Sequence, residues 1–192
     1  PLCEGCSEPL APIEPPLCYR CGCSRRTPTG SDAFPGGGDL CASCISFPPS
    51  FALARSCWSY EGPILQAWPR VKYAKEEALI RDVAALSRES LRAQLADWVE
   101  AYGTLEVHPV PMHRSGLLKR GFHAPAKLLR HILEGAPIAG VEVRQGVLKK
   151  RRKTAQQAGL GKLARYRNLE GAFVVSADLA GATVVLFDDV YT

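Results

Sequence analysis

The stretch 182-ATVVLFDDVYT-192 decides the class of fold, because six apolar or β-branched residues run directly into two carboxylates. A continuous apolar run of this length is typical of a strand that is buried on both faces of a parallel sheet. In open α/β sheets, ligands bind beyond the carboxyl ends of the strands. The position of Asp188 and Asp189 directly after the run therefore predicts that they belong to a ligand site.

The segments that precede this strand alternate between strand and helix patterns, which indicates an α/β fold. A helix is expected at 63–73, with an interruption at Pro69. Two more are expected between residues 79 and 102, broken near Ser87–Ser90, and another covers Ala126 to Glu134. Strands are expected at the following segments: 57–60, 104–111, 141–148, 173–175 and 182–187. Segment 149–168 is expected to be a mobile basic loop that leads into a helical turn.

Positive charge is concentrated in one part of the chain. Residues 113–167 contain 14 Lys and Arg against two acids, whereas the remainder contains 10 basic and 17 acidic residues. This asymmetry predicts an anionic partner, such as a polyphosphate, a nucleic acid or an acidic membrane surface. Parallel strands would bring two basic loops, 109–123 and 149–157, to the same edge as the two terminal aspartates.

Neither a membrane span nor a signal peptide is expected in this chain. No apolar run approaches the roughly 18 residues that a spanning helix needs. The start of the chain also lacks a charged segment followed by an apolar one. We therefore expect a cytoplasmic protein.

All eight cysteines lie within the first 57 residues, and six of them form three C-x-x-C pairs. This spacing is typical of tetrahedral zinc sites, which take four ligands at about 2.3 Å. The best single set is Cys18, Cys21, Cys41 and Cys44, with Gly22 allowing the backbone to turn beneath the metal. Cys3 and Cys6 are expected to be ligands whose partners are not apparent, and Cys23 and Cys57 are expected to be spare. A disulfide-bonded secreted module is the alternative.

The composition predicts two domains with different sources of stability. Residues 1–52 are rich in Pro, Gly and Ser and too poor in aliphatic residues to bury a core. A structural zinc ion would supply the missing free energy of folding. Residues 53–192 carry the apolar patterns and form the α/β domain.

Carboxylates and cationic loops at one sheet edge favour a phosphorylated sugar as the ligand. Carboxylates accept hydrogen bonds from sugar hydroxyls or hold Mg²⁺, and Lys and Arg neutralise phosphates. Taken alone, paired aspartates also occur in plain solvated turns. A run such as 149-KKRRK-153 is more often a solvated face or a nucleic-acid patch. The combination of the two features is more specific than either.

Several motifs, in order along the chain, resemble the ComF/GntX family of competence-associated proteins. The Cys18–Gly22 and Leu40–Cys44 segments resemble its amino-terminal double zinc ribbon. The remaining matches are Ser59–Gly62, Val71–Tyr73, Val110–Pro111 with Lys119–Phe122, Lys153–Gln157 with Arg165–Asn168, and Leu186–Thr192. The last of these resembles the start of a motif that binds phosphoribosyl pyrophosphate (PRPP).

The resemblance implies a type I phosphoribosyltransferase-like parallel sheet flanked by helices, with a small zinc-ribbon module before it. It implies that PRPP binds with Mg²⁺ and that phosphoribosyl is transferred to an unknown acceptor. Asp188, Asp189, Arg152 and Lys153 would then serve catalysis. Substrate binding would fall to Arg114, Arg120, Gly121, Gln157, Tyr191 and Thr192. Because the motif is cut at Thr192, a C-terminally truncated chain is expected, with a zinc ribbon incomplete at its start.

Two points leave room for another function. His123 and Ala124 stand where the family usually has Asn and Gln, so a contact made there would be altered. The family's association with DNA uptake implies a second hypothesis, a non-catalytic module that binds single-stranded DNA or proteins of the competence machinery. The paired acids argue against this second reading, as do the sparse aromatics of the basic region. A third hypothesis is a degenerate fragment without activity.

Overall fold

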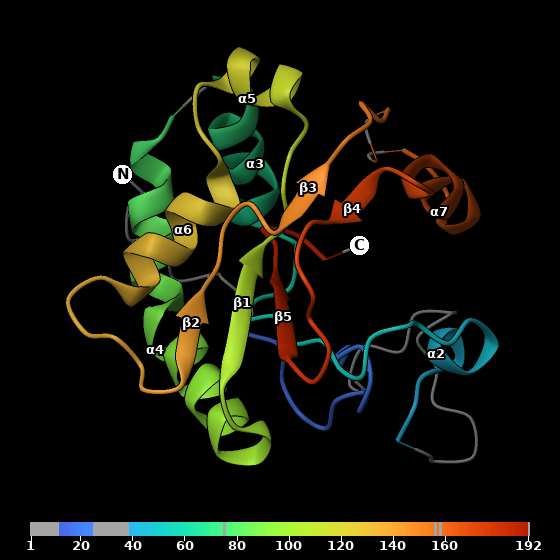
Figure 1. The fold of residues 1–192 in the computed structure, drawn as a ribbon, viewed down its shortest axis with the longest axis vertical. Helices are drawn as coiled ribbons and strands as arrows, with labels where there is room; N and C mark the ends of the chain where they lie inside the picture. Colours follow the sequence, from blue (N-terminus) through green and yellow to red (C-terminus); the bar gives the residue numbers. More distant parts are fainter. Residues whose placement is uncertain (1–11, 25–38, 75, 156, 158, 192) are drawn as a thin grey trace. The chain divides into compact units, whose positions relative to one another are not determined.

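The computed structural model describes residues 12–24, 39–74, 76–155, 157 and 159–191, and Cys3, Cys6 and Thr192 lie outside them. The chain divides into two compact units, one that ends at Gln66 and one that begins at Ala67. The division falls inside helix α3 (Pro63–Pro69). Figure 1 shows the elements of both units in sequence colours.

A three-stranded parallel sheet organises the larger unit, with β1 (Leu105–Pro109) between β2 (Val141–Val143) and β5 (Thr183–Phe187). Leu105 pairs with Val141 on one side and with Thr183 on the other. The α/β class is thus confirmed, and the carboxyl ends of all three strands meet at one edge of the sheet.

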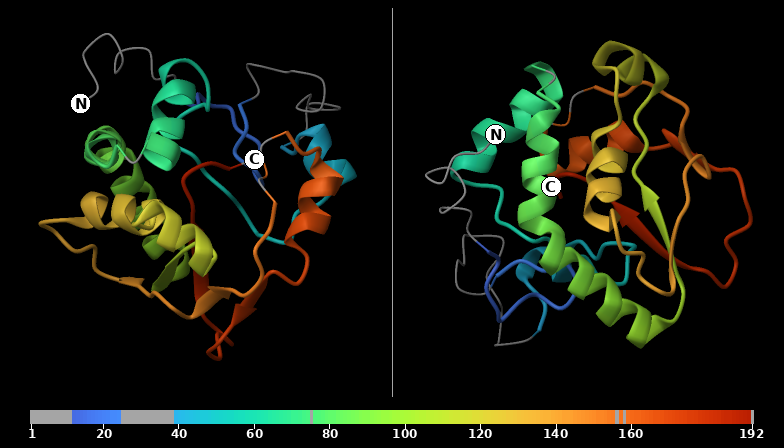
Figure 2. Two further views of the ribbon diagram at one scale, coloured as in Figure 1. Left: turned by 90° about the horizontal axis from the view of Figure 1, so that it is seen from above. Right: turned by 90° about the vertical axis from the view of Figure 1, so that its left-hand side faces the viewer.

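Two helices, α4 (Ala78–Tyr102) and α6 (Ala124–Leu133), supply the apolar cover of this sheet. They lie side by side in both views of Figure 2. Leu95 of α4 and Leu129 of α6 pack against Leu105 and Val107 of β1, and all four side chains are buried. Burial of such side chains is the main source of stability for this unit.

The break expected near Ser87–Ser90 is wrong, since α4 is one continuous helix. The segment contains neither Gly nor Pro, and Ser87 is itself buried on the face that carries Leu79, Val83 and Leu95. An unbroken apolar face therefore outweighs the modest helix propensity of serine. The helix ends at Gly103, which has a positive φ of 77°.

The strand expected at 141–148 is present only over its first three residues. The chain turns at Gly146, with a φ of 85°, so that the residues form β2 and the separate strand β3 (Leu148–Lys150). β3 pairs antiparallel with β4 (Phe173–Val175), which confirms the strand predicted there. Helix α7 (Lys162–Leu169) lies between the two strands in sequence.

β5 lies where it was predicted, but it is not buried on both faces. Its side chains alternate, with Val184 39% and Leu186 62% exposed, while Val185 and Phe187 pack on the core. A continuous apolar run cannot by itself reveal how many faces of a strand are covered.

The expected interruption of the helix at Pro69 is confirmed. α3 ends there, and a π-helical turn, η3 (Arg70–Ala74), follows directly. A short helix, α5 (Arg114–Arg120), follows β1 and buries none of its residues. Across the described residues, no helix is both long enough and apolar enough to span a membrane.

The N-terminal unit contains little regular structure in its described part. An isolated bridge joins Leu17 to Ser24, and the short helix α2 (Ala42–Ser46) carries Cys44. Where a strand was expected at 57–60, a single bridge joins Trp58 to Pro12.

Candidate functional site

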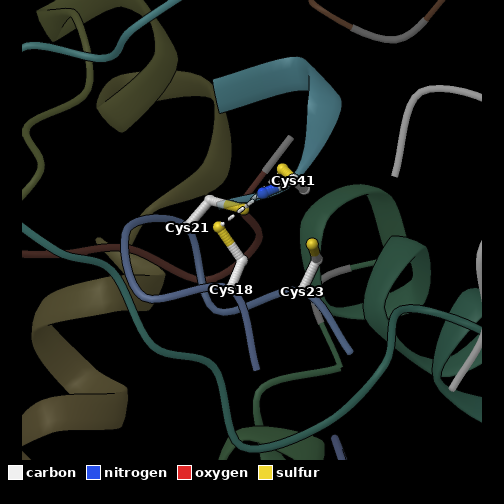
Figure 3. A group of neighbouring side chains, drawn as sticks. All are labelled: Cys18, Cys21, Cys23 and Cys41. Carbon is white, nitrogen blue, oxygen red and sulfur yellow. Dashed lines mark hydrogen bonds between the residues drawn. The ribbon is translucent and has the colours of Figure 1, made fainter. Parts of the chain in front are cut away.

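Five cysteine thiols gather in the N-terminal unit. The sulfurs of Cys18, Cys21, Cys23 and Cys41 all lie within 4.8 Å of one another. Figure 3 shows these four side chains. Tetrahedral zinc at about 2.3 Å separates its sulfurs by about 3.8 Å. The Sγ atoms of Cys21 and Cys41 are 3.7 Å apart, which fits this geometry. The four thiols could therefore hold a zinc ion.

A tight turn holds the Cys18/Cys21 pair. The amide of Cys18 donates to Cys23 O at 2.8 Å, and the amide of Gly22 donates to Cys18 O at 3.0 Å. Gly22 has a φ of 73°, and a Cβ there would lie 2.6 Å from Ala54 O. Only glycine fits this position, which confirms the turn predicted beneath the metal.

Cys23 and Cys44 differ from expectation. We expected Cys23 to be spare, whereas the structure places its thiol in the group of four. Cys44, the expected fourth ligand, is 6% exposed, and its thiol interacts with those of Cys21 and Cys41. Five thiols thus surround a position that needs four ligands.

The pKa shifts of these thiols indicate which of them loses its proton most easily and so can bind a metal as a thiolate. Burial alone would raise the pKa of Cys18, but backbone amides of Cys21, Cys41 and Arg20 donate to its sulfur and lower the pKa to about 6. Burial raises the pKa of Cys21, Cys23 and Cys44, and for the last two the neighbouring thiols add to this effect. Crowded, desolvated thiols of this kind need a cation to ionise together.

Asp188 and Asp189 form the second cluster, directly after the carboxyl end of β5. The adjoining end of β1 is tied to the same place, because the amide of Val110 donates to Phe187 O at 2.8 Å. The amide of Asp189 donates to Asp188 Oδ1 at 2.9 Å. The sheet therefore places both carboxyl groups at the edge where ligands of α/β proteins bind.

Lys72 contacts Asp189 from the π-helical turn η3. Its Nζ lies 2.9 Å from Oδ1 and 2.9 Å from Oδ2 of the carboxylate. The Asp189 side chain is only 9% exposed and the Lys72 side chain 25%. In the sequence, Lys72 stands out only as part of the resemblance to the ComF/GntX family, because 117 residues separate it from Asp189.

Asp188 lies in a different electrostatic environment. Desolvation by the surrounding protein, together with the charge of Asp189, raises the pKa of Asp188 to about 6. Lys72 and Lys150 act in the opposite direction. Lys150 comes from β3, where burial lowers its pKa while the charge of Asp188 raises it. The expected approach of the basic segment to the acid pair is therefore made by Lys150, which was not among the predicted site residues.

His123 joins the loop after β1 to the same cluster. Its Nε2 donates to Val110 O at 2.9 Å. Burial lowers the pKa of the imidazole, the Val110 carbonyl and Asp189 oppose this, and Arg120 adds to it. His123 also lines an open hollow of about 510 Å³ beside α6, with Lys127, Arg130 and Gln145 on its wall.

Arg152 and Lys153 were expected to serve catalysis. The guanidinium of Arg152 donates to Asn168 O at 3.0 Å and to Glu170 O at 2.7 Å, so it caps the end of α7. The Asn168 carboxamide holds Ala155 through two further hydrogen bonds. Lys153 is exposed between these contacts. The basic segment is therefore secured to α7 rather than extended.

The remaining predicted residues that the structure describes lie on several segments of the larger unit. Gly121 ends α5 with a left-handed φ of 89°, and Arg120 precedes it, while Arg114 begins the helix and is exposed. Tyr191 is 55% exposed. Both polar atoms of the Gln157 side chain are buried and have no partner among the described residues. Of this set, Arg120 has an electrostatic link to the acid pair, through His123.

Comparison with known proteins adds no relative. The chain matches no family model, no curated protein and no solved structure. The resemblance to the ComF/GntX family therefore remains a prediction that rests on the motifs alone.

Proposed function

We propose that the chain is a phosphoribosyltransferase-like protein of the ComF type, which binds PRPP with Mg²⁺ and transfers phosphoribosyl to an acceptor. The observation that carries the proposal is the approach of two lysines to the two carboxylates after β5, Lys72 in contact with Asp189 and Lys150 acting on Asp188. A phosphorylated sugar presents hydroxyls and phosphates together. A mixed cluster of this kind is complementary to such a ligand.

In the proposed reaction, a nucleophilic atom of the acceptor bonds to the anomeric carbon while the bond to pyrophosphate breaks. Asp188 and Asp189 would accept hydrogen bonds from the ribose hydroxyls or hold Mg²⁺, for which carboxylate oxygens are suitable ligands. Arg120, at the end of α5, would neutralise the departing pyrophosphate. The side chains act by positioning and by charge.

The N-terminal unit contributes a structural metal site in this proposal. Cysteine thiolates prefer zinc, whereas carboxylate oxygens prefer magnesium. Zinc would therefore bind at the cysteine cluster, and Mg²⁺ would bind at the aspartates. No reactive role of the cysteines is required.

The proposal is tested by removing both carboxylate charges together. We expect the double variant Asp188→Asn/Asp189→Asn to lose Mg²⁺-dependent PRPP binding, measured by calorimetry. The control is Asp97→Asn, an exposed residue of α4, which should bind like the unaltered chain. Undiminished binding by the double variant would refute the proposal.

A second candidate, binding of single-stranded nucleic acid, is favoured by a different surface. α7 exposes Tyr166 (71%) and Leu163 (63%) within the basic part of the chain. An exposed aromatic ring flanked by arginines can stack on a base. DNA affinity that falls steeply with salt and does not change with PRPP would favour this candidate over the first.

A further inference from the structure

The contact between Lys72 and Asp189 is unusual for an ion pair at the end of a strand. Both carboxylate oxygens are 2.9 Å from Nζ, and the carboxylate is almost fully covered. Exposed ion pairs are weak and easily screened, whereas partly buried pairs are screened much less. The ammonium group is therefore a persistent positive charge at this carboxylate.

Stability alone gives a poor explanation for such a pair. Covering two charges carries a desolvation penalty that often equals the attraction between them. The lysine is presented by a π-helical turn, a rare structure that is found mainly at functional sites. The pair also lies at the ligand-binding edge of the sheet rather than within the core.

The two neighbouring aspartates are consequently unequal. Asp189 is held by a lysine in direct contact, whereas within the described part of the chain Lys150 acts on Asp188 without forming an ion pair with it. A divalent cation held by this pair would need oxygens from both carboxylates to bind well. At Asp189, the lysine already occupies the side from which such a cation would approach.

From this geometry we infer that Lys72 is a positioning residue that acts as a tethered cation: it fixes Asp189 and prevents a free divalent ion from being chelated by the two aspartates. This inference rests on the proposed function and narrows it: Asp188, rather than both aspartates, is left to contact a ribose hydroxyl or the Mg²⁺ that accompanies PRPP. Asp189 and Lys72 form an ion pair without net charge next to Asp188.

The test is a titration of the zinc-loaded chain with Mn²⁺, which prefers oxygen ligands, followed by electron paramagnetic resonance. Lys72→Gln should bind Mn²⁺ about tenfold more tightly than the unaltered chain, because the removed charge repels the ion. Lys72→Arg keeps the charge and should resemble the unaltered chain. Lys149→Gln, an exposed residue of β3, removes the same charge elsewhere and should also have no effect.

A further variant keeps the inference open to refutation if Lys72→Gln folds poorly. Lys72→Gln/Asp189→Asn removes both charges of the pair, so no unpaired buried charge remains. It should leave Mn²⁺ affinity within about twofold of the unaltered chain, because the pair is neutral and Asp189 is unavailable to the ion. Equal Mn²⁺ affinity of Lys72→Gln and the unaltered chain, or a marked loss in the double variant, would overturn the inference.

The Mn²⁺ titration contains no phosphoribosyl compound, so its outcome is independent of the calorimetric test of PRPP binding. Tightened Mn²⁺ binding without PRPP binding would leave the tethered cation in place and reject the proposed ligand. PRPP binding without the Mn²⁺ effect would do the reverse.

Discussion

Among the described residues of the N-terminal unit, the most deeply buried side chains are those of Cys18 and Cys41, whereas in the larger unit the buried core is mainly aliphatic, as in Leu105 and Leu129. The first unit has little regular structure in its described residues, and the second has a sheet covered by α4 and α6. The difference teaches that one chain can combine two sources of stability. In the N-terminal unit, thiolate–metal bonds would replace the core that its few apolar residues cannot build.

Removal of a bound metal should have the largest effect, because it should destabilise the N-terminal unit and leave the larger unit unchanged. Structural zinc contributes roughly 10–16 kcal/mol of apparent binding free energy, so chelation should open the turn at residues 17–24. Amides of β1, β5 and α6 should stay protected, because their core is apolar. Hydrogen exchange followed by mass spectrometry measures both regions at once. Unchanged exchange at 17–24 would mean that no metal stabilises this unit.

A matched pair of variants sharpens that result. Cys23→Ser should weaken zinc binding more than Cys44→Ser, because the Cys23 thiol is the one that lies within 4.8 Å of the other three sulfurs. Cys18→Ser serves as the positive control for ligand loss. The opposite order of affinities would restore Cys44 as the fourth ligand.

A core substitution should have a smaller effect, confined to the other unit. Leu129→Ala removes a buried side chain that packs on β1 and should lower the free energy of unfolding by about 2–5 kcal/mol. Leu118→Ala is the control, since Leu118 is 86% exposed, and should change stability by less than about 0.5 kcal/mol. Thermal unfolding of both variants, together with their zinc content, checks the prediction. Loss of zinc from Leu129→Ala would contradict the independence of the units.

The smallest expected effect concerns pH and Asp188. Its pKa rises from an ordinary 3.8 to about 6 on folding, through desolvation and the charge of Asp189. The folded carboxyl thus binds its proton more tightly than the unfolded one, so this group's contribution to stability falls as pH rises from about 4 to about 6. Asp188→Asn should therefore gain melting temperature relative to the unaltered chain at pH 7 but not at pH 4. A difference that is constant across this range would contradict the raised pKa.

The elements that were predicted correctly share one property: their secondary structure is determined by the residues of the segment itself. Strands at 104–111, 173–175 and 182–187 and the helix break at Pro69 follow from apolar composition or from proline geometry. The errors at Ser87–Ser90 and at 141–148 arose where packing decided the outcome. A buried serine extended one helix, and a turn at Gly146 divided one strand.

In the candidate sites, too, some features follow from local sequence and others from tertiary packing. C-x-x-C spacing was enough to predict a metal site, because each tight turn fixes two thiols locally. The approach of the Cys23 thiol could not be read from the spacing, since it depends on how the turn at 18–23 meets Cys41. Likewise the terminal aspartates were visible as residues, but the lysines that act on them were not.

The sequence by itself therefore determined the α/β class, the cysteine turns and the presence of two carboxylates after a strand, because each depends on residues close together in the chain. The tertiary structure alone decided that Lys72 holds Asp189, that Lys150 acts on Asp188 and that Arg152 caps a helix. These pairings depend on the packing of distant elements, and the strength of a charge–charge contact depends on the burial that such packing creates.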